Sequence, residues 1–219
     1  MVDITPIVRH YEQCFKQHGC TPKGMDWPNE TDLTTRFEVM LELIDESIEK
    51  PAVLDLGCGY GALLDQLNEN HGLGWLDYSG IDISPMLVEA ARDRWPGYDF
   101  QCRDILRDRA LPESVDYVIM NGVLTEKQSL PADEMTAYAK QLIRAAFEIA
   151  RRGIAFNVMS TDVDWTRDDL FHWSVEDAES FLRREVTENV RIRDDYGLFE
   201  YTVYLWRGSK VLQNGSTEG

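Results

Sequence analysis

The chain has 219 residues, of which 43% are hydrophobic and 11% aromatic, enough for the core of one α/β domain. Its net charge of −17 argues against nucleic acid and anionic membranes as partners, because such a surface repels phosphate groups. There is no apolar run of about 18 residues, no signal segment and no C-x-x-C pair, so we expect a cytoplasmic protein with free thiols. The four histidines show no metal-ligand spacing, so no metal is expected.

The first 50 residues are expected to form a helical segment ahead of the main domain. Apolar residues recur on one face over residues 3–18, which predicts a short helix. A second helix is predicted from about Thr31 to Ile48, with Thr31 as its N-cap. The loop between the two helices is rich in glycine and proline and carries Trp27.

A strand followed by a glycine turn begins the main domain. Residues 53–56 form a short apolar run, and Gly57, Gly59 and Gly61 follow at once, ahead of a helical stretch. Asp82 ends the next apolar segment, where an acid holds the ribose in nucleotide-binding α/β folds. The glycine spacing differs from the G-x-G-x-x-G of dinucleotide sites. A dinucleotide site and a turn without any ligand remain as alternatives.

The rest of the chain alternates strands with helices. This alternation predicts an α/β fold with a mostly parallel, doubly wound sheet that fills residues 51–207. Residues 208–219 are polar and are expected to be a disordered tail. The predicted strands are 75–83, 98–102, 115–120, 153–159, 191–194 and 200–207, and the predicted helices are 86–94, 131–150 and 174–187.

Two motifs together resemble one enzyme family. The run Asp55-Leu-Gly-Cys-Gly-Tyr-Gly61, followed by Gly80-Ile-Asp-Ile-Ser-Pro-Met86, is similar to the class I S-adenosylmethionine-dependent methyltransferases. The resemblance implies a Rossmann-like, seven-stranded sheet with an antiparallel C-terminal hairpin and an N-terminal helical lid. It implies S-adenosyl-L-methionine as the cofactor and S-adenosyl-L-homocysteine as the product.

The same resemblance implies a cofactor site at the carboxyl ends of the strands. In similar enzymes the glycine turn passes under the amino-acid and ribose portions, and an acid such as Asp82 accepts hydrogen bonds from the ribose. Alternatively, Asp104 caps the turn that follows its strand, and Met86 packs in the core. The residues predicted to bind the cofactor are Asp55, Gly57, Cys58, Gly59, Asp82, Ile83, Met86, Asp104, Ile105, Asn121, Gly122, Tyr11, Trp27 and Arg36.

Two residues of the lid carry specific expectations. Trp27 is placed to close on the sulfonium by cation–π attraction, and Arg36 to pair with the methionine carboxylate. The alternatives are that Trp27 fills a surface groove and that Arg36 is a solvated helix residue.

The acceptor side is expected after the fifth strand. His172 is the candidate general base, because histidine is the side chain that ordinarily gains and loses a proton near neutral pH. The alternative is a structural role between its aromatic neighbours. The residues predicted to bind the acceptor are Asn157, Ser160, Trp165, Tyr196 and Tyr201.

A small-molecule acceptor, methylated at O or N, is the predicted substrate. Residues 18–27, 152–157 and 195–202 also resemble a bacterial subgroup of small-molecule methyltransferases, and no Asn-Pro-Pro-Tyr motif of nucleic-acid methylation is present. The alternative functions are a Rossmann-type NAD(P)-binding oxidoreductase and a non-catalytic, cofactor-binding regulatory domain. No feature of the sequence sets the oligomeric state.

Overall fold

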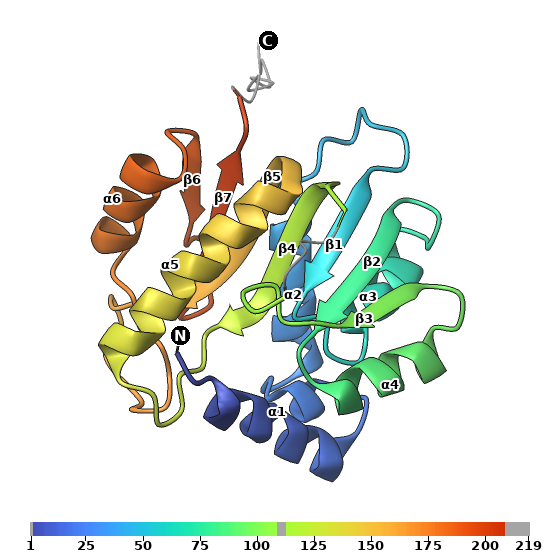
Figure 1. Ribbon diagram of the computed structural model, residues 1–219, viewed down its shortest axis with the longest axis horizontal. Helices are drawn as coiled ribbons and strands as arrows, with labels where there is room; N and C mark the ends of the chain where they lie inside the picture. Colours follow the sequence, from blue (N-terminus) through green and yellow to red (C-terminus); the bar gives the residue numbers. More distant parts are fainter. Residues whose placement is uncertain (1, 109–112, 209–219) are drawn as a thin grey trace.

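A computed structural model describes residues 2–108 and 113–208 of the chain. The expected disordered tail lies outside the described residues from position 209 onward. Seven strands form one sheet in the order β3-β2-β1-β4-β5-β7-β6 (Figure 1). Neighbouring strands from β3 to β5 are parallel, whereas β7 is antiparallel to both β5 and β6, as predicted. The strands are β1 (Ala52–Leu56), β2 (Asp77–Asp82), β3 (Asp99–Cys102), β4 (Val115–Leu124), β5 (Ala150–Met159), β6 (Val190–Arg193) and β7 (Glu200–Trp206).

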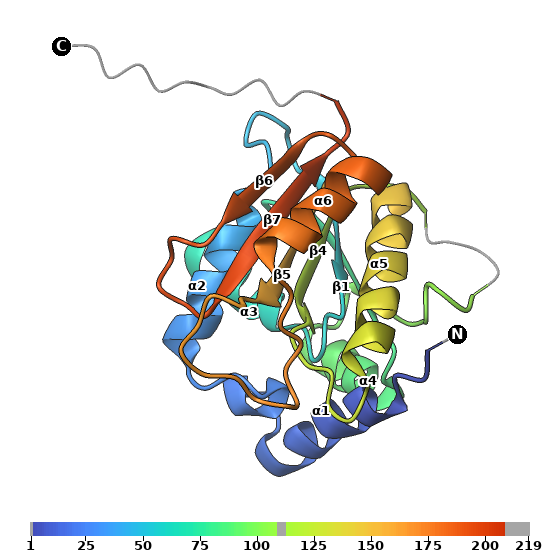
Figure 2. The same ribbon diagram turned by 90° about the vertical axis from the view of Figure 1, so that its left-hand side faces the viewer.

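Helices cover both faces of the sheet. Figure 2 shows α5 (Ala132–Ile149) and α6 (Val175–Glu185) on one side, and α2 (Glu30–Leu41) and α3 (Ala62–Asn70) on the other. Apolar residues of α4 (Pro85–Arg94) belong to the same core cluster as those of α2 and α3. The sheet therefore separates two apolar cores, which is the doubly wound arrangement.

The N-terminal segment crosses the carboxyl ends of the parallel strands. Helix α1 (Thr5–His18) lies beneath the strand ends in Figure 1, and the short helix η1 (Pro22–Met25) packs against it. Ile4 and Ile7 join the core cluster of the α5 face, so this segment is anchored by apolar burial. The strand ends and α1 together enclose the region where open α/β sheets bind ligands.

The boundaries of α2 differ from the sequence prediction. Asn29, not Thr31, is the N-cap, because the extended backbone at Asn29 lets its side chain accept the Asp32 N–H at 2.8 Å. The helix ends at Leu41 rather than Ile48. Leu43 and Ile44, which follow the helix, are nonetheless buried, so the apolar pattern continues into a turn that packs against the core.

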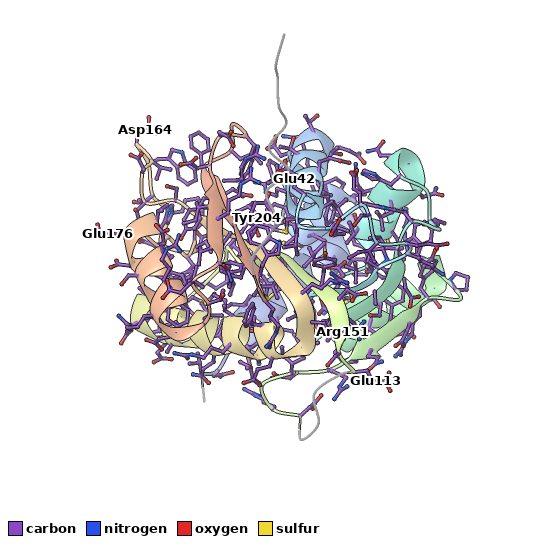
Figure 3. All side chains as sticks on the ribbon, turned by 90° about the horizontal axis from the view of Figure 1, so that it is seen from above. Glu42, Glu113, Arg151, Asp164, Glu176 and Tyr204 are labelled. Atoms are coloured by element: carbon purple, nitrogen blue, oxygen red, sulfur yellow. The ribbon has the colours of Figure 1, made fainter. Side chains whose placement is uncertain are left out.

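Acidic side chains are spread around the surface. Figure 3 shows Glu113, Asp164 and Glu176 projecting outward at separate places on the periphery, whereas Tyr204 lies over the sheet. Within the described residues, no helix combines the length and apolar character that a bilayer crossing requires.

Candidate cofactor and acceptor site

A cavity lies between α1 and the carboxyl ends of the parallel strands. Its wall combines apolar side chains with a few polar groups, which is the usual composition of a small-molecule site. The lining residues are Ile4, Ile7, Val8, Tyr11, Met25, Trp27, Leu56, Gly57, Ile81, Asp82, Ile83, Ser84, Leu87, Arg103, Asp104, Ile105, Asn121, Gly122, Val123, Tyr138 and Leu142.

Asp82, the last residue of β2, is the buried acid of this cavity. Its Oδ2 accepts the Gly59 N–H at 2.9 Å, and its Oδ1 accepts the Ser84 N–H at 2.8 Å. Burial raises the pKa of Asp82 above its usual value, and the backbone donors oppose that rise. Each carboxylate oxygen has a second lone pair, so the group can also accept hydrogen bonds from a ligand.

Two glycines allow the backbone to approach the cavity closely. Gly57 has a φ of +83°, and a Cβ there would lie 2.4 Å from Val123 Cγ2. Gly122, near the end of β4, has a φ of +79°, and a Cβ there would lie 2.4 Å from Trp27 Cζ2. The cavity wall therefore depends on the absence of a side chain at both glycines.

The N-terminal segment is tied to the strand ends by hydrogen bonds. Tyr11 donates its hydroxyl to the Gly122 carbonyl at 3.1 Å. The Ser84 hydroxyl donates to Glu12 at 2.8 Å, which joins α1 to the turn that follows β2. Burial raises the pKa of Tyr11, so its phenol stays a neutral donor. Helix α1 thus covers one side of the cavity.

The polar groups of the cavity fit S-adenosylmethionine. Asn121 Oδ1 is buried without a hydrogen-bond partner among the described residues, so it is an acceptor available for a ligand donor such as an ammonium group. The Asp82 carboxylate lines the same cavity as a further group of acceptors, and Ile83 and Ile105 line it with apolar surface. These acceptors and apolar side chains therefore suit a ligand with an amino-acid end and a nucleoside end.

Most of the predicted cofactor residues meet at this cavity, and several lie beside it. Asp55 is 3% exposed and accepts the Tyr78 hydroxyl at 2.9 Å, so it is held beneath the glycine turn. Cys58 is buried, with its sulfur on the core side of the turn near Gly80. The predicted residues that line the cavity are Gly57, Asp82, Ile83, Asp104, Ile105, Asn121, Gly122, Tyr11 and Trp27.

Met86 and Gly59 also depart from the expected contacts. Leu87, rather than Met86, lines the cavity, because one step along a helix turns a side chain by about 100°. Gly59 contributes its amide to Asp82 and is covered by Met25, whose Cε would lie 2.7 Å from a Cβ there.

Arg36 is a correction to the sequence analysis. Its Nε lies 2.9–3.0 Å from both carboxylate oxygens of Glu200, and its guanidinium stacks on Trp27 at 4.3 Å from the ring centroid. Arg36 is buried and does not line the cavity, so it is neither solvated nor placed against a cofactor carboxylate. Its positive charge is paired with the carboxylate of Glu200, the first residue of β7.

The predicted acceptor residues do not line the cavity. Asn157 is fully buried. Its side-chain oxygen accepts the Gly122 N–H at 2.7 Å, and its NH₂ group donates to Glu200. Tyr201 is fully buried and donates to the Trp173 carbonyl at 3.0 Å, so it packs in the core instead of facing an acceptor.

Of the three remaining predicted residues, Ser160 and Trp165 lie beside His172, whereas Tyr196 does not. His172 Nδ1 lies 2.6 Å from the Ser160 carbonyl oxygen, and Trp165 meets the imidazole edge-on. His172 Nε2 is buried with no partner among the described residues. Tyr196 is elsewhere, with its hydroxyl 3.0 Å from Thr202 Oγ1.

Sequence reasoning missed several residues of the cavity wall. Ile4, Ile7 and Val8 belong to the apolar face of the helix predicted over residues 3–18, for which the sequence predicts no role in the site. Tyr138 and Leu142 come from α5. Their helical periodicity is the signal of a buried face, and it cannot tell core packing from a cavity wall.

Comparisons with known proteins agree with this architecture. A family model described as "Methyltransferase domain" matches residues 53–146. A protein of Mycobacterium tuberculosis that is named as a methyltransferase is 32% identical over 164 residues, which cover 72% of this chain and 94% of that protein. The chain therefore belongs to the class I S-adenosylmethionine-dependent methyltransferases, whose cofactor is S-adenosyl-L-methionine.

Solved structures share the fold. Magnesium protoporphyrin IX methyltransferase from Synechocystis, solved with bound S-adenosylmethionine, aligns with a TM-score of 0.63 at 17% identity, over 95% of this chain and 99% of that one. Human N-acetylserotonin methyltransferase aligns with a TM-score of 0.58 at 17% identity, over 80% of this chain and 52% of that one. These matches favour a methyltransferase over the oxidoreductase that the sequence left as an alternative.

Proposed function

We propose that this enzyme methylates an oxygen or nitrogen atom of a small-molecule acceptor. The proposal rests chiefly on the cover that residues 4–27 place over the cavity. Tyr11 is hydrogen-bonded to the Gly122 carbonyl, and Trp27 packs on the same glycine. An acceptor must therefore enter past these two side chains, which favours a small molecule over a macromolecule. We assign this segment the role of a lid.

The cofactor supplies an electrophilic methyl group on a positively charged sulfur. Asp82 would accept the ribose hydroxyls, and Asn121 Oδ1 would accept a hydrogen bond from the methionine ammonium. Trp27 and Tyr11 would exclude water from the cavity. Because the methyl group is already activated, alignment and exclusion of water are the main tasks left to the protein.

A general base is needed only for a neutral hydroxyl or a protonated amine. His172 stays the candidate: its Nδ1 is oriented by the Ser160 carbonyl, and its Nε2 has no described partner. It lies outside the cavity wall, so an acceptor would have to extend beyond the cavity to meet it.

A labelling experiment tests the proposal. A cell extract separated by molecular mass is incubated with the enzyme and tritium-labelled S-adenosylmethionine, with the Asp82→Ala variant as the control. We expect label in the small-molecule fraction with the wild type and not with the variant. Label confined to protein or nucleic acid would contradict the proposed acceptor class.

A further inference from the structure

Three potential metal ligands converge beside the lid. His10 and Cys14 are four residues apart on α1, so both side chains project from the same face of the helix. His10 Nε2 lies 2.9 Å from Asp26 Oδ2 and 3.8 Å from Cys14 Sγ. The three ligand atoms all lie within 4.8 Å of one another.

Asp26 is presented to this helix face by a rigid turn. It follows η1 in the left-handed conformation, with a φ of 58°, and its N–H donates to the Lys23 carbonyl at 3.1 Å. The next residue, Trp27, donates its N–H to the Pro22 carbonyl at 2.9 Å. These two hydrogen bonds hold the backbone of Asp26 in place, and His10 contacts its carboxylate.

We propose that His10, Cys14 and Asp26 form a binding site for a divalent transition metal of the zinc class. A tetrahedral zinc ion with ordinary bond lengths places nitrogen and sulfur ligands about 3.5 Å apart and nitrogen and oxygen ligands about 3.3 Å apart. The two distances from His10 Nε2, 3.8 and 2.9 Å, each differ from these values by less than about 0.5 Å. Cys14 Sγ and the Asp26 carboxylate lie within 4.8 Å of each other, so side-chain movement that brings them to about 3.5 Å completes the site.

The ligand set selects among metals. A thiolate and an imidazole suit Zn²⁺ or Co²⁺, whereas Mg²⁺ and Ca²⁺ prefer oxygen ligands. Three protein ligands leave a fourth position for water, and Asp26 is exposed enough to permit it.

The site would join the two parts of the lid. His10 precedes Tyr11 and Asp26 precedes Trp27, and both of these neighbours line the cavity at Gly122. A metal held by α1 and by the loop after η1 would therefore fix both contacts at once. The competing arrangement is a His10–Asp26 ion pair that needs no metal.

Cobalt titration of the metal-free full chain tests the proposal. We expect one equivalent of Co²⁺ to bind with a thiolate-to-cobalt charge-transfer band, and one equivalent of Zn²⁺ to remove that band. Cys14→Ser should abolish the band, and Cys102→Ser, at an exposed cysteine on β3, should keep it. A band that survives in Cys14→Ser, or a wild type that shows none, would overturn the proposal.

A second variant protects the test against misfolding. Asp26→Asn keeps the shape of the side chain and removes the charged ligand, and we expect Co²⁺ to bind at least about tenfold more weakly, a loss of about 1.4 kcal/mol. Thermal melting without metal should show both variants folded. Zinc should raise the melting temperature of the wild type and leave that of Cys14→Ser unchanged, and an equal rise in both proteins would contradict the site.

Discussion

Arg36 of α2 and Glu200 of β7 form an ion pair whose side chains are only 8% and 0% exposed. The pair joins residues 164 positions apart in the chain. Glu200 also accepts the Asn157 amide at 2.8 Å, and Asn157 in turn accepts the Gly122 N–H at 2.7 Å. The charge of Arg36 is thus connected through two side chains to the glycine at the cavity wall.

Replacing Glu200 by alanine should destabilise the fold strongly. The Arg36 charge would remain buried without a partner, and breaking such a pair costs about 3–5 kcal/mol. Asp65→Ala is the matched control, since its partner Arg94 is 41% exposed and an exposed pair is worth about 0–1 kcal/mol. Urea denaturation measures both free energies of unfolding, and losses of equal size would contradict the buried pair.

Gly122→Ala should weaken cofactor binding as well as stability. The new Cβ would meet Trp27 and force the indole away from the cavity. Gly197→Ala separates the two effects, because Gly197 has a similar φ of +76° and nothing within 4 Å of its Cβ position. We expect both variants to lose about 1–2 kcal/mol through backbone strain. Only Gly122→Ala should raise the dissociation constant of S-adenosylhomocysteine severalfold by calorimetry.

Local sequence patterns predicted the site residues that the sheet contributes. The contacts of the N-terminal segment could not be predicted in this way, because they join residues far apart in the sequence. Gly57 and Asp82 could be found because a strand, a turn and a second strand lie close together in the sequence. Arg36 could not be assigned, because nothing near it in the sequence reveals that Glu200 is its partner. The prediction that Tyr201 contacts the acceptor failed for a similar reason. Both faces of β7 are buried, so the sequence of this strand shows no alternation that would tell an exposed side chain from a buried one.

Asp82→Asn should bind S-adenosylhomocysteine more weakly than the wild type does. Both carboxylate oxygens accept backbone N–H groups, from Gly59 and Ser84. An amide would turn an NH₂ group toward one of these donors, which costs about 1–3 kcal/mol of stability. It would also leave one acceptor oxygen fewer for the ligand, and this second effect lowers the affinity. We expect affinity to fall at least about tenfold by calorimetry. Asp77→Asn, at the exposed start of the same strand, should bind as the wild type does, and equal affinities in all three proteins would remove Asp82 from the site.

Asp55→Asn should make the protein more stable at neutral and alkaline pH. Burial raises the pKa of Asp55 from 3.8 to about 7, although the Tyr78 hydroxyl partly opposes this rise. Between these two values the unfolded chain releases the proton and the folded chain keeps it, so stability falls as the pH rises and the full cost is reached above about pH 7. At about 1.4 kcal/mol for each pKa unit, that cost is about 4 kcal/mol.

Asparagine retains a carbonyl oxygen to accept the Tyr78 hydroxyl and carries no charge. The gain of Asp55→Asn over the wild type should therefore be small near pH 4 and grow up to about pH 7, as measured by urea denaturation across that range. Asp77→Asn, on the exposed end of β2, should follow the wild-type pH dependence. An Asp55→Asn protein that becomes less stable than the wild type as the pH rises would mean that the carboxylate form of Asp55 is the one the fold stabilises.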